Sequence, residues 1–170
     1  MNISVRKGKK TDLPGVLTLI KELALYEKAP LEVTLTLEEL EKDFKAHHPL
    51  FSFFVAQWES KVNRSNKNGR KVINPIVGIA LYYYGYSTWK GKRMYLDDIV
   101  VTEKLRGKGI GKMLFDKVVS EAKKNKVKQI MWQVLEWNTP AINFYKKYNA
   151  ILDPEWITGK LNEEQLGRLR

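Results

Sequence analysis

The chain has 170 residues, of which 30 are Lys or Arg and 19 are Asp or Glu, giving a formal net charge of +11 at pH 7. Its length fits one domain, 1–170, and its 44% of hydrophobic residues is typical of a globular protein. The absence of cysteine excludes disulfides, thiolate metal ligands and a cysteine nucleophile, and the two histidines are neighbours, so we expect no metal site. No apolar run is long enough for a membrane span and no signal-peptide pattern opens the chain, so we expect a cytoplasmic protein without a membrane partner.

The charges are unevenly distributed along the chain. Between residues 22 and 43, seven acids stand against two lysines, whereas 59–75 and 112–128 are basic. A positive net charge is compatible with nucleic-acid binding. Separate acidic and basic segments instead suit a cationic ligand and a polyanionic ligand, respectively, so we expect no nucleic-acid partner.

Hydrophobic periodicity predicts the elements of the first half. A short strand includes Ile3 and Val5, and Thr11 is expected to cap a helix with an i, i+3, i+4 apolar face through residue 24. A capping box at 36–39 opens a second helix, and a strand follows at 51–58. Residues 63–69 contain no apolar side chain and are expected to form a loop.

The second half continues with alternating strands and helices. A long strand at 76–86 is expected to pair with 92–101, followed by a helix that ends near residue 124. The remaining expected elements are a strand at 128–135, a helix from Thr139, a closing strand at 150–157 and a short helix from Asn162. This order predicts a mixed α/β fold in one domain.

A glycine-rich turn separates the strand at 92–101 from the next helix. It consists of Arg106, Gly107, Lys108, Gly109, Ile110, Gly111 and Lys112. Backbone N–H groups at a helix start attract a pyrophosphate, and glycine allows the close approach of the main chain. The spacing matches neither a P-loop nor the dinucleotide fingerprint. The alternative interpretation is a tight basic connection with no ligand.

A second motif follows the expected strand at 128–135. Asn138 or Thr139 can cap a helix, and Pro140 suits its first turn. The pattern N-x-x-A-I-x-F-Y-x-K runs from Asn138 to Lys147, about thirty residues after the glycine-rich turn. Together, R-G-x-G-I-G and this pattern resemble the two shared motifs of the GNAT superfamily of N-acetyltransferases.

Further segments resemble the diamine, or spermidine/spermine, N-acetyltransferase branch of that superfamily. They include 19–27, 80–84, 95–98 and 136–138, and the resemblance spans about residues 3–157. It implies a mixed, twisted central sheet of about six or seven strands with helices on both faces. It also implies acetyl-CoA as co-substrate, a small primary amine as acceptor and a homodimer.

The resemblance implies a cofactor site on both motifs. The residues of the glycine-rich turn would bind the pyrophosphate, and pantetheine would lie where the two neighbouring strands diverge. The backbone of Ile99 and Val101 would bind the pantetheine amides, and an N–H near Ile99 or Val100 would hold the thioester oxygen. In the second motif, Asn138, Phe144 and Lys147 would contact the cofactor.

Acetyl transfer requires an amine that loses its proton and a thiolate that gains one. The resemblance makes Tyr145 the proton donor to the thiolate, because a phenol is protonated at neutral pH. Asp97 takes the place of the acid that binds the amine or relays its proton through water. The alternative for Tyr145 is a place in the apolar core.

Four further residues are expected around the acceptor. Asp98 is adjacent to Asp97 on a strand, so the two side chains should point to opposite faces. Tyr26, Glu27 and Trp89 would line the acceptor pocket, since aromatic faces attract cations. The alternatives are surface charge for the two aspartates and half-buried packing for the aromatic residues. Open alternatives for function are an acetyltransferase for a protein N-terminus or an aminoglycoside, or a non-catalytic module that binds CoA or nucleic acid.

Overall fold

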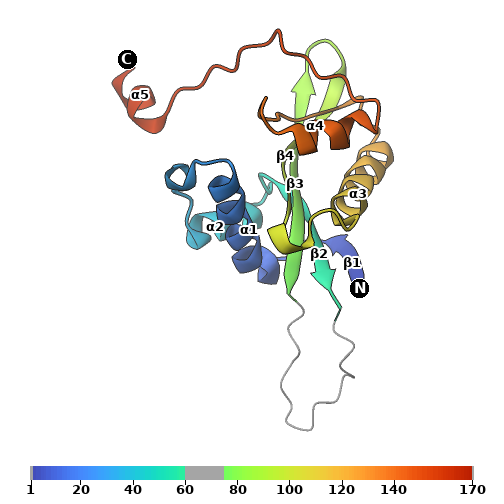
Figure 1. The fold of residues 1–170 in the computed structure, drawn as a ribbon. Coiled ribbons are helices and arrows are strands. Elements are labelled where there is room, and N and C mark those ends of the chain that lie inside the picture. Colours follow the sequence, from blue (N-terminus) through green and yellow to red (C-terminus); the bar gives the residue numbers. More distant parts are fainter. Residues whose placement is uncertain (1, 60–74, 170) are drawn as a thin grey trace. The chain divides into compact units, whose positions relative to one another are not determined.

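A five-stranded sheet organises the first part of the chain in the computed structural model, which describes residues 2–59 and 75–169 (Figure 1). The strand order is β1-β2-β3-β4-β5. The pairs β1–β2, β2–β3 and β3–β4 are antiparallel, and the pair β4–β5 is parallel. The strands are β1 (Ile3–Lys7), β2 (Ser52–Trp58), β3 (Ile76–Ser87), β4 (Gly91–Val101) and β5 (Gln129–Met131). The mixed α/β class is confirmed, but the sheet of the described residues has five strands instead of six or seven.

Helices cover both faces of this sheet (Figure 1). On one face α1 (Leu13–Tyr26) and α2 (Leu37–Lys45) pack over an apolar cluster that includes Val55, Ile79 and Val100. On the other face α3 (Ile110–Lys124) contacts β1 to β4 and buries Ile110, Leu114, Phe115, Val118 and Ala122. None of the described helices is both long enough and apolar enough to cross a membrane.

The helix starts show which local predictions hold. The capping box of α2 is confirmed, with the Thr36 side chain accepting from the Glu39 N–H at 3.2 Å. The prediction that Thr11 caps α1 is wrong, because a 3-10 turn at Lys10–Asp12 precedes the helix and makes Asp12 its N-cap. The loop predicted at 63–69 lies outside the described residues.

Residues from 134 onward form a second compact unit, which is described here by itself. It contains α4 (Thr139–Lys146) and α5 (Glu163–Arg168), both near their predicted positions. The predicted closing strand at 150–157 is wrong: this segment has no regular structure, and Ile151 and Ile157 are almost fully exposed. A strand needs a hydrogen-bonded neighbour, and none of the described strands pairs with this segment.

A buried ion pair joins β1 to the start of α1. Asp12 is 5% exposed and accepts two hydrogen bonds from the Arg6 guanidinium, at 2.6 and 2.9 Å, and a third from the Lys9 N–H at 2.9 Å. Burial alone would raise the pKa of the Asp12 carboxyl, but Arg6 and the Lys9 N–H more than offset it and lower that pKa below its usual value. The charged carboxylate therefore stabilises the fold.

We expect Asp12→Asn to lower the free energy of unfolding by about 2 kcal/mol at pH 7, since Arg6 then loses its anion. A lowered folded-state pKa gives stability that is present above the unfolded value of about 3.9 and lost as pH falls through the folded value. Urea titrations of both proteins at pH 7 and at several values below 4 measure this difference. A difference that is absent at pH 7, or that stays constant down to pH 2, would contradict the assignment.

Candidate functional site

The register between β3 and β4 shifts at one point in the middle of the sheet. Leu81 pairs with Asp98 and the next residue, Tyr82, pairs with Leu96, so Asp97 is an extra residue on β4. This β-bulge interrupts the usual alternation of side chains. Consequently Asp97 and Asp98 line the same pocket. The expectation that they point to opposite faces is therefore wrong.

The pocket has a volume of about 420 Å³ and lies on the sheet face covered by α1 and α2. Apolar side chains form most of its wall, and the polar groups are Tyr83, Asp43 and the two adjacent aspartates. Its lining consists of Ile20, Leu35, Leu40, Asp43, Leu50, Phe51, Leu81, Tyr83, Asp97 and Asp98. Such a pocket can hold a small ligand with an apolar body and a cationic group.

Three carboxyl groups in this region have pKa values above their usual range. Burial raises the pKa of Asp98 to about 7, and the negative charges of Asp97 and Glu27 contribute to the shift. Burial also raises the pKa of Asp97, which keeps part of its surface in solvent, and that of Glu27. None of the three forms an ion pair with a described residue. The site is therefore poised to accept a proton or a cation.

The edge of β4 is open beyond the bulge. β5 has three residues instead of the predicted 128–135, and its pairing with β4 covers only Arg93 to Tyr95, so β4 has no strand partner on this edge beyond that point among the described residues. The Thr102 N–H donates to the Val77 carbonyl at 3.0 Å, and the antiparallel alternation then directs the backbone groups of Ile99 and Val101 away from β3. An extended ligand can hydrogen-bond to such an edge. By the same alternation the backbone of Val100 faces β3, so it does not offer the N–H suggested for it.

The glycine-rich turn leads from β4 into α3. Gly107 and Gly109 have φ values of +74° and +82°, a conformation that glycine adopts without strain. The helical ladder begins with the Met113 N–H donating to the Gly109 carbonyl at 3.1 Å, no side chain caps the helix and no acid occupies its first turn. The N–H groups that precede Met113 in this turn therefore have no partner within the helix. This geometry fits a bound pyrophosphate.

The first predicted residue of the turn already has protein contacts. The Arg106 guanidinium lies over the Tyr26 ring at 4.4 Å, and its Nε donates to the Val101 carbonyl at 3.0 Å. Glu22 in α1 accepts from the Thr102 hydroxyl at 3.0 Å and from the Glu103 N–H at 2.7 Å. These contacts hold residues 102–106, which precede Gly107, against the C-terminal end of α1. Tyr26 supports that turn and is not part of the pocket lining.

Trp89 lies far from the pocket within one chain. It occupies the turn between β3 and β4 and is 81% exposed. From the Ser87–Gly91 pair to the Leu81–Asp98 pair, β3 extends by six residues, about 20 Å at the usual rise. The structure therefore does not bring Trp89 together with Asp97 and Asp98.

The remaining predicted residues belong to the second unit. Asn138 caps α4, its side chain accepting from the Ala141 N–H at 3.3 Å. Tyr145 is buried, with its ring centroid 5.2 Å from that of Phe144. Lys147 is exposed and follows the last residue of α4.

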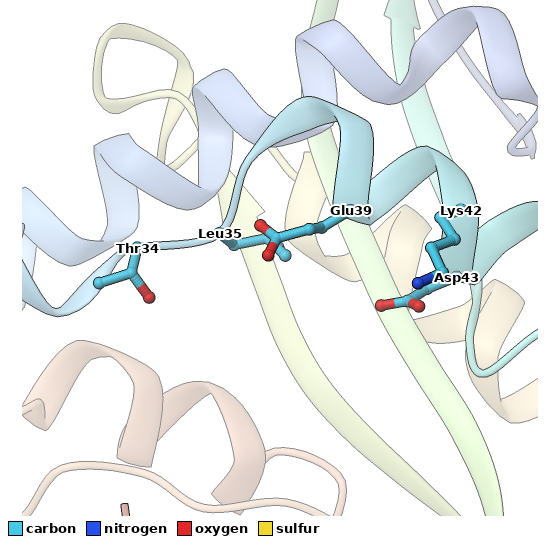
Figure 2. A pocket seen from close by; sticks show the side chains of 5 residues that line it. All are labelled: Thr34, Leu35, Glu39, Lys42 and Asp43. Atoms are coloured by element: carbon cyan, nitrogen blue, oxygen red, sulfur yellow. The ribbon is translucent and has the colours of Figure 1, made fainter. Parts of the chain in front are cut away.

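A second hollow lies beside the linker to α2 (Figure 2). It has a volume of about 360 Å³ and is lined by Thr34, Leu35, Glu39, Lys42 and Asp43. Glu39 is engaged in the capping box, since its Oε2 accepts from the Thr36 N–H at 2.8 Å. This hollow holds none of the carboxyl groups whose pKa is raised, so the pocket at the bulge is the candidate acceptor site.

Sequence reasoning missed several pocket residues. Three consecutive tyrosines, 82–84, lie on β3, and the structure divides them: Tyr82 is fully buried, whereas Tyr83 lines the pocket. Strand alternation signals such a division. The part of α2 and the following loop that supply Leu40, Asp43 and Phe51 carry no motif, so only the fold reveals their role.

Comparisons with known proteins point to one family. A sequence profile described as the acetyltransferase (GNAT) family matches residues 19–150. A thialysine N-epsilon-acetyltransferase of Bos taurus is 36% identical over 87% of this chain and 84% of its own. A human spermidine/spermine N(1)-acetyltransferase-like protein 1 is 33% identical over 95% of this chain but 23% of its own. An aminoglycoside acetyltransferase from an uncultured soil metagenomic sample has a similar fold, with a TM-score of 0.71 at 18% identity over 94% of this chain and 95% of its own.

Gly111 offers the sharpest test of the glycine-rich turn. Replacing Gly109 by valine strains the backbone because of the positive φ, whereas a Cβ on Gly111 meets only Val101 Cγ2, at 3.9 Å. We therefore expect Gly111→Ala to preserve the melting temperature but to weaken CoA binding at least tenfold, because the methyl group occupies space needed by the pyrophosphate. Calorimetric titration with CoA measures this effect. An unchanged dissociation constant would remove the turn from the cofactor site.

Proposed function

The chain belongs to the acetyltransferase (GNAT) family, and we propose that it transfers an acetyl group from acetyl-CoA to a primary amine of a small cationic acceptor. The acceptor class comprises diamines, polyamines and lysine-like amino acids. The observation that carries this proposal is the pocket at the β4 bulge, with two adjacent carboxyl groups next to an open strand edge. The names of the relatives, which specify thialysine and spermidine/spermine, support a cationic acceptor.

Two carboxyl groups in the pocket, with Glu27 outside its lining, supply the attraction and the base that an amine needs. Asp97 and Glu27 attract the ammonium form, and Glu27 stands at the C-terminal end of α1, where the helix dipole does not favour a negative charge. A carboxylate there costs stability, which is consistent with a role in binding a cation. Asp98, with a pKa of about 7, accepts the amine proton directly or through one water molecule.

Other residues complete the transfer in a ternary complex. Acetyl-CoA supplies the acetyl thioester; the amine nitrogen forms the new C–N bond while the C–S bond breaks. The glycine-rich turn binds the pyrophosphate, and the outward N–H groups of Ile99 and Val101 bind the pantetheine and the carbonyl oxygen. Tyr145 donates a proton to the departing thiolate, and Asn138, Phe144 and Lys147 bind the cofactor. No covalent enzyme intermediate is required.

We further propose that the protein acts as a homodimer. The segment after α4 exposes a series of large apolar side chains, including Ile151, Trp156 and Ile157, and the hairpin tip exposes Trp89. Exposed apolar residues of this density are typical of an interface. In a dimer the hairpin tip of one subunit could line the acceptor pocket of the other, which would restore the predicted role of Trp89.

An acetyltransferase for an aminoglycoside remains a second candidate, on the likeness in fold alone. The pocket volume of about 420 Å³ favours a smaller acceptor. Release of free CoA in the presence of a panel of amines separates these candidates. A protein that binds acetyl-CoA but releases no CoA with any amine would be a binding module.

We expect Asp98→Asn to lower kcat/KM for the amine by about 100-fold or more, because the amide accepts no proton. The wild-type rate should fall as pH drops below about 7, where Asp98 becomes protonated, and this inflection should be absent in the variant. Asp97→Asn is the matched control: it should raise KM for the amine and keep the inflection, shifted to lower pH because the charge of Asp97 no longer raises the pKa of Asp98. The opposite assignment of effects would make Asp97 the base.

Removal of the charge at Asp98 should not destabilise the protein. A raised folded-state pKa means that the ionised carboxylate is less favourable in the folded state than in the unfolded state. The melting temperature of Asp98→Asn at pH 8 should therefore equal or exceed that of the wild type. A large decrease would mean that loss of activity reflects a loss of structure.

We expect Tyr145→Phe to retain the fold and both substrate affinities but to lower the rate of acetyl transfer by about 100-fold, because the ring remains and the proton donor is lost. Single-turnover rates are the proper measurement, since product release can hide a chemical step. Equal single-turnover rates in the two proteins would show that the Tyr145 side chain only packs.

A further inference from the structure

The sheet face that carries Asp97 and Asp98 continues past the pocket along β3 and β4. Tyr83 and Tyr95 are paired in register on this face, and their rings are stacked at a centroid distance of 5.2 Å and an interplanar angle of 25°. The next pair on the same face is Gly85 and Arg93. A row therefore runs from two carboxyl groups over an aromatic pair to one guanidinium.

The Arg93 side chain lies across the strand at Gly85. A Cβ on Gly85 would be 3.4 Å from Arg93 Nε and 3.7 Å from its Cγ, so the missing side chain provides the space for the guanidinium. Arg93 Nη1 donates to Met131 Sδ at 3.4 Å, and a thioether is a weak acceptor. Arg93 Nε is buried without an acceptor, and no carboxylate of a described residue lies within 4.0 Å of this guanidinium. The Arg93 guanidinium therefore has at least one N–H donor, at Nε, without a protein acceptor.

The aromatic pair lies between the two charged ends. Burial raises the pKa of both tyrosine hydroxyls, the charge of Asp97 raises it further, and the charge of Arg93 opposes that shift. Both rings therefore lie within electrostatic range of both ends. Asp97 and Arg93 nevertheless form no ion pair with each other. The charges at the two ends of the row therefore do not neutralise each other.

We propose that Arg93, with Tyr83 and Tyr95, forms a second acceptor subsite that binds a carboxylate at the end of the acceptor opposite to the reacting amine. This proposal rests on the proposed function and makes the acceptor an amino acid with a side-chain amine. Between Arg93 and Asp97, β4 extends by about 13 Å at the usual rise. The long Arg93 side chain and the acceptor together have to span this distance.

The chemistry of the row discriminates between acceptors. A guanidinium binds a carboxylate through two parallel hydrogen bonds, and the tyrosine faces contact the methylene groups of the acceptor. A diamine of the same length places a second ammonium group against Arg93, where like charges repel. Arg93 therefore selects against diamines and polyamines in a pocket whose carboxylates attract them.

Lysine and cadaverine form the matched substrate pair, because they differ only in the carboxylate. We expect the wild-type protein to have a kcat/KM for lysine at least tenfold above that for cadaverine. Arg93→Gln should raise KM for lysine at least tenfold with little change in kcat. The same substitution should leave kcat/KM for cadaverine unchanged or increase it. Arg93→Lys, which keeps the charge but loses the fork, should recover part of the preference. KM for acetyl-CoA and the melting temperature serve as controls for the fold.

The outcomes separate this proposal from the proposed function. Two results overturn the subsite and leave the proposed acetyltransferase activity intact. One is a wild-type kcat/KM for cadaverine equal to or above that for lysine. The other is an unchanged ratio of kcat/KM for lysine to kcat/KM for cadaverine in Arg93→Gln. Release of CoA with neither amine overturns the small-amine acceptor and the subsite together. A strong decrease of the lysine-to-cadaverine ratio of kcat/KM in Arg93→Gln, with a partial recovery of that ratio in Arg93→Lys, supports the subsite.

Discussion

The single extra residue in β4 is the feature on which the candidate site depends. Without the bulge at Asp97, strand alternation would place Asp97 and Asp98 on opposite sides of the sheet, one toward α1 and the other toward α3. Because of the bulge, both carboxyl groups line one pocket, while Leu96 stays in the core beside its strand partner Tyr82. It thereby brings two like charges together, and their proximity contributes to the raised pKa of Asp98. The interruption of strand pairing at the bulge therefore contributes to the raised pKa of Asp98.

One strand and the turn after it arrange the charges of the site in sequence order. Arg93 is followed by the two aspartates, then by the open edge at Ile99 and Val101, and then by the basic glycine-rich turn. Under the proposed function a cationic acceptor and a polyanionic cofactor would be attracted to opposite ends of the same rigid element. The sheet neighbour β3 and the helices α1 and α3 fix this element, so orientation does not depend on a mobile loop.

The sequence predicted the parts of the site that rest on local chemistry. Glycine at positive φ, the Asn138 cap and the strand before the turn each leave a short-range pattern, and each is found where it was expected. The bulge leaves no such pattern, because Leu96, Asp97 and Asp98 read as an ordinary strand. For the same reason Asp98 was not identified as the most perturbed acid, and Arg93 was not singled out. The predicted strand at 150–157 failed because its side chains fit a strand while its backbone has no neighbour among the described strands.

The two ends of the row affect turnover differently. Acetylation converts the ammonium group into a neutral amide, so the attraction of Asp97, Asp98 and Glu27 acts on the substrate and is lost in the product. Under the proposed function the acidic end would therefore promote both binding of the amine and release of the amide. A carboxylate held by Arg93 is unchanged by the reaction and is bound equally in substrate, transition state and product. Such uniform binding lowers KM without raising kcat. In the proposed enzyme Arg93 would consequently set which amine is used, whereas Asp98 would set how fast it reacts.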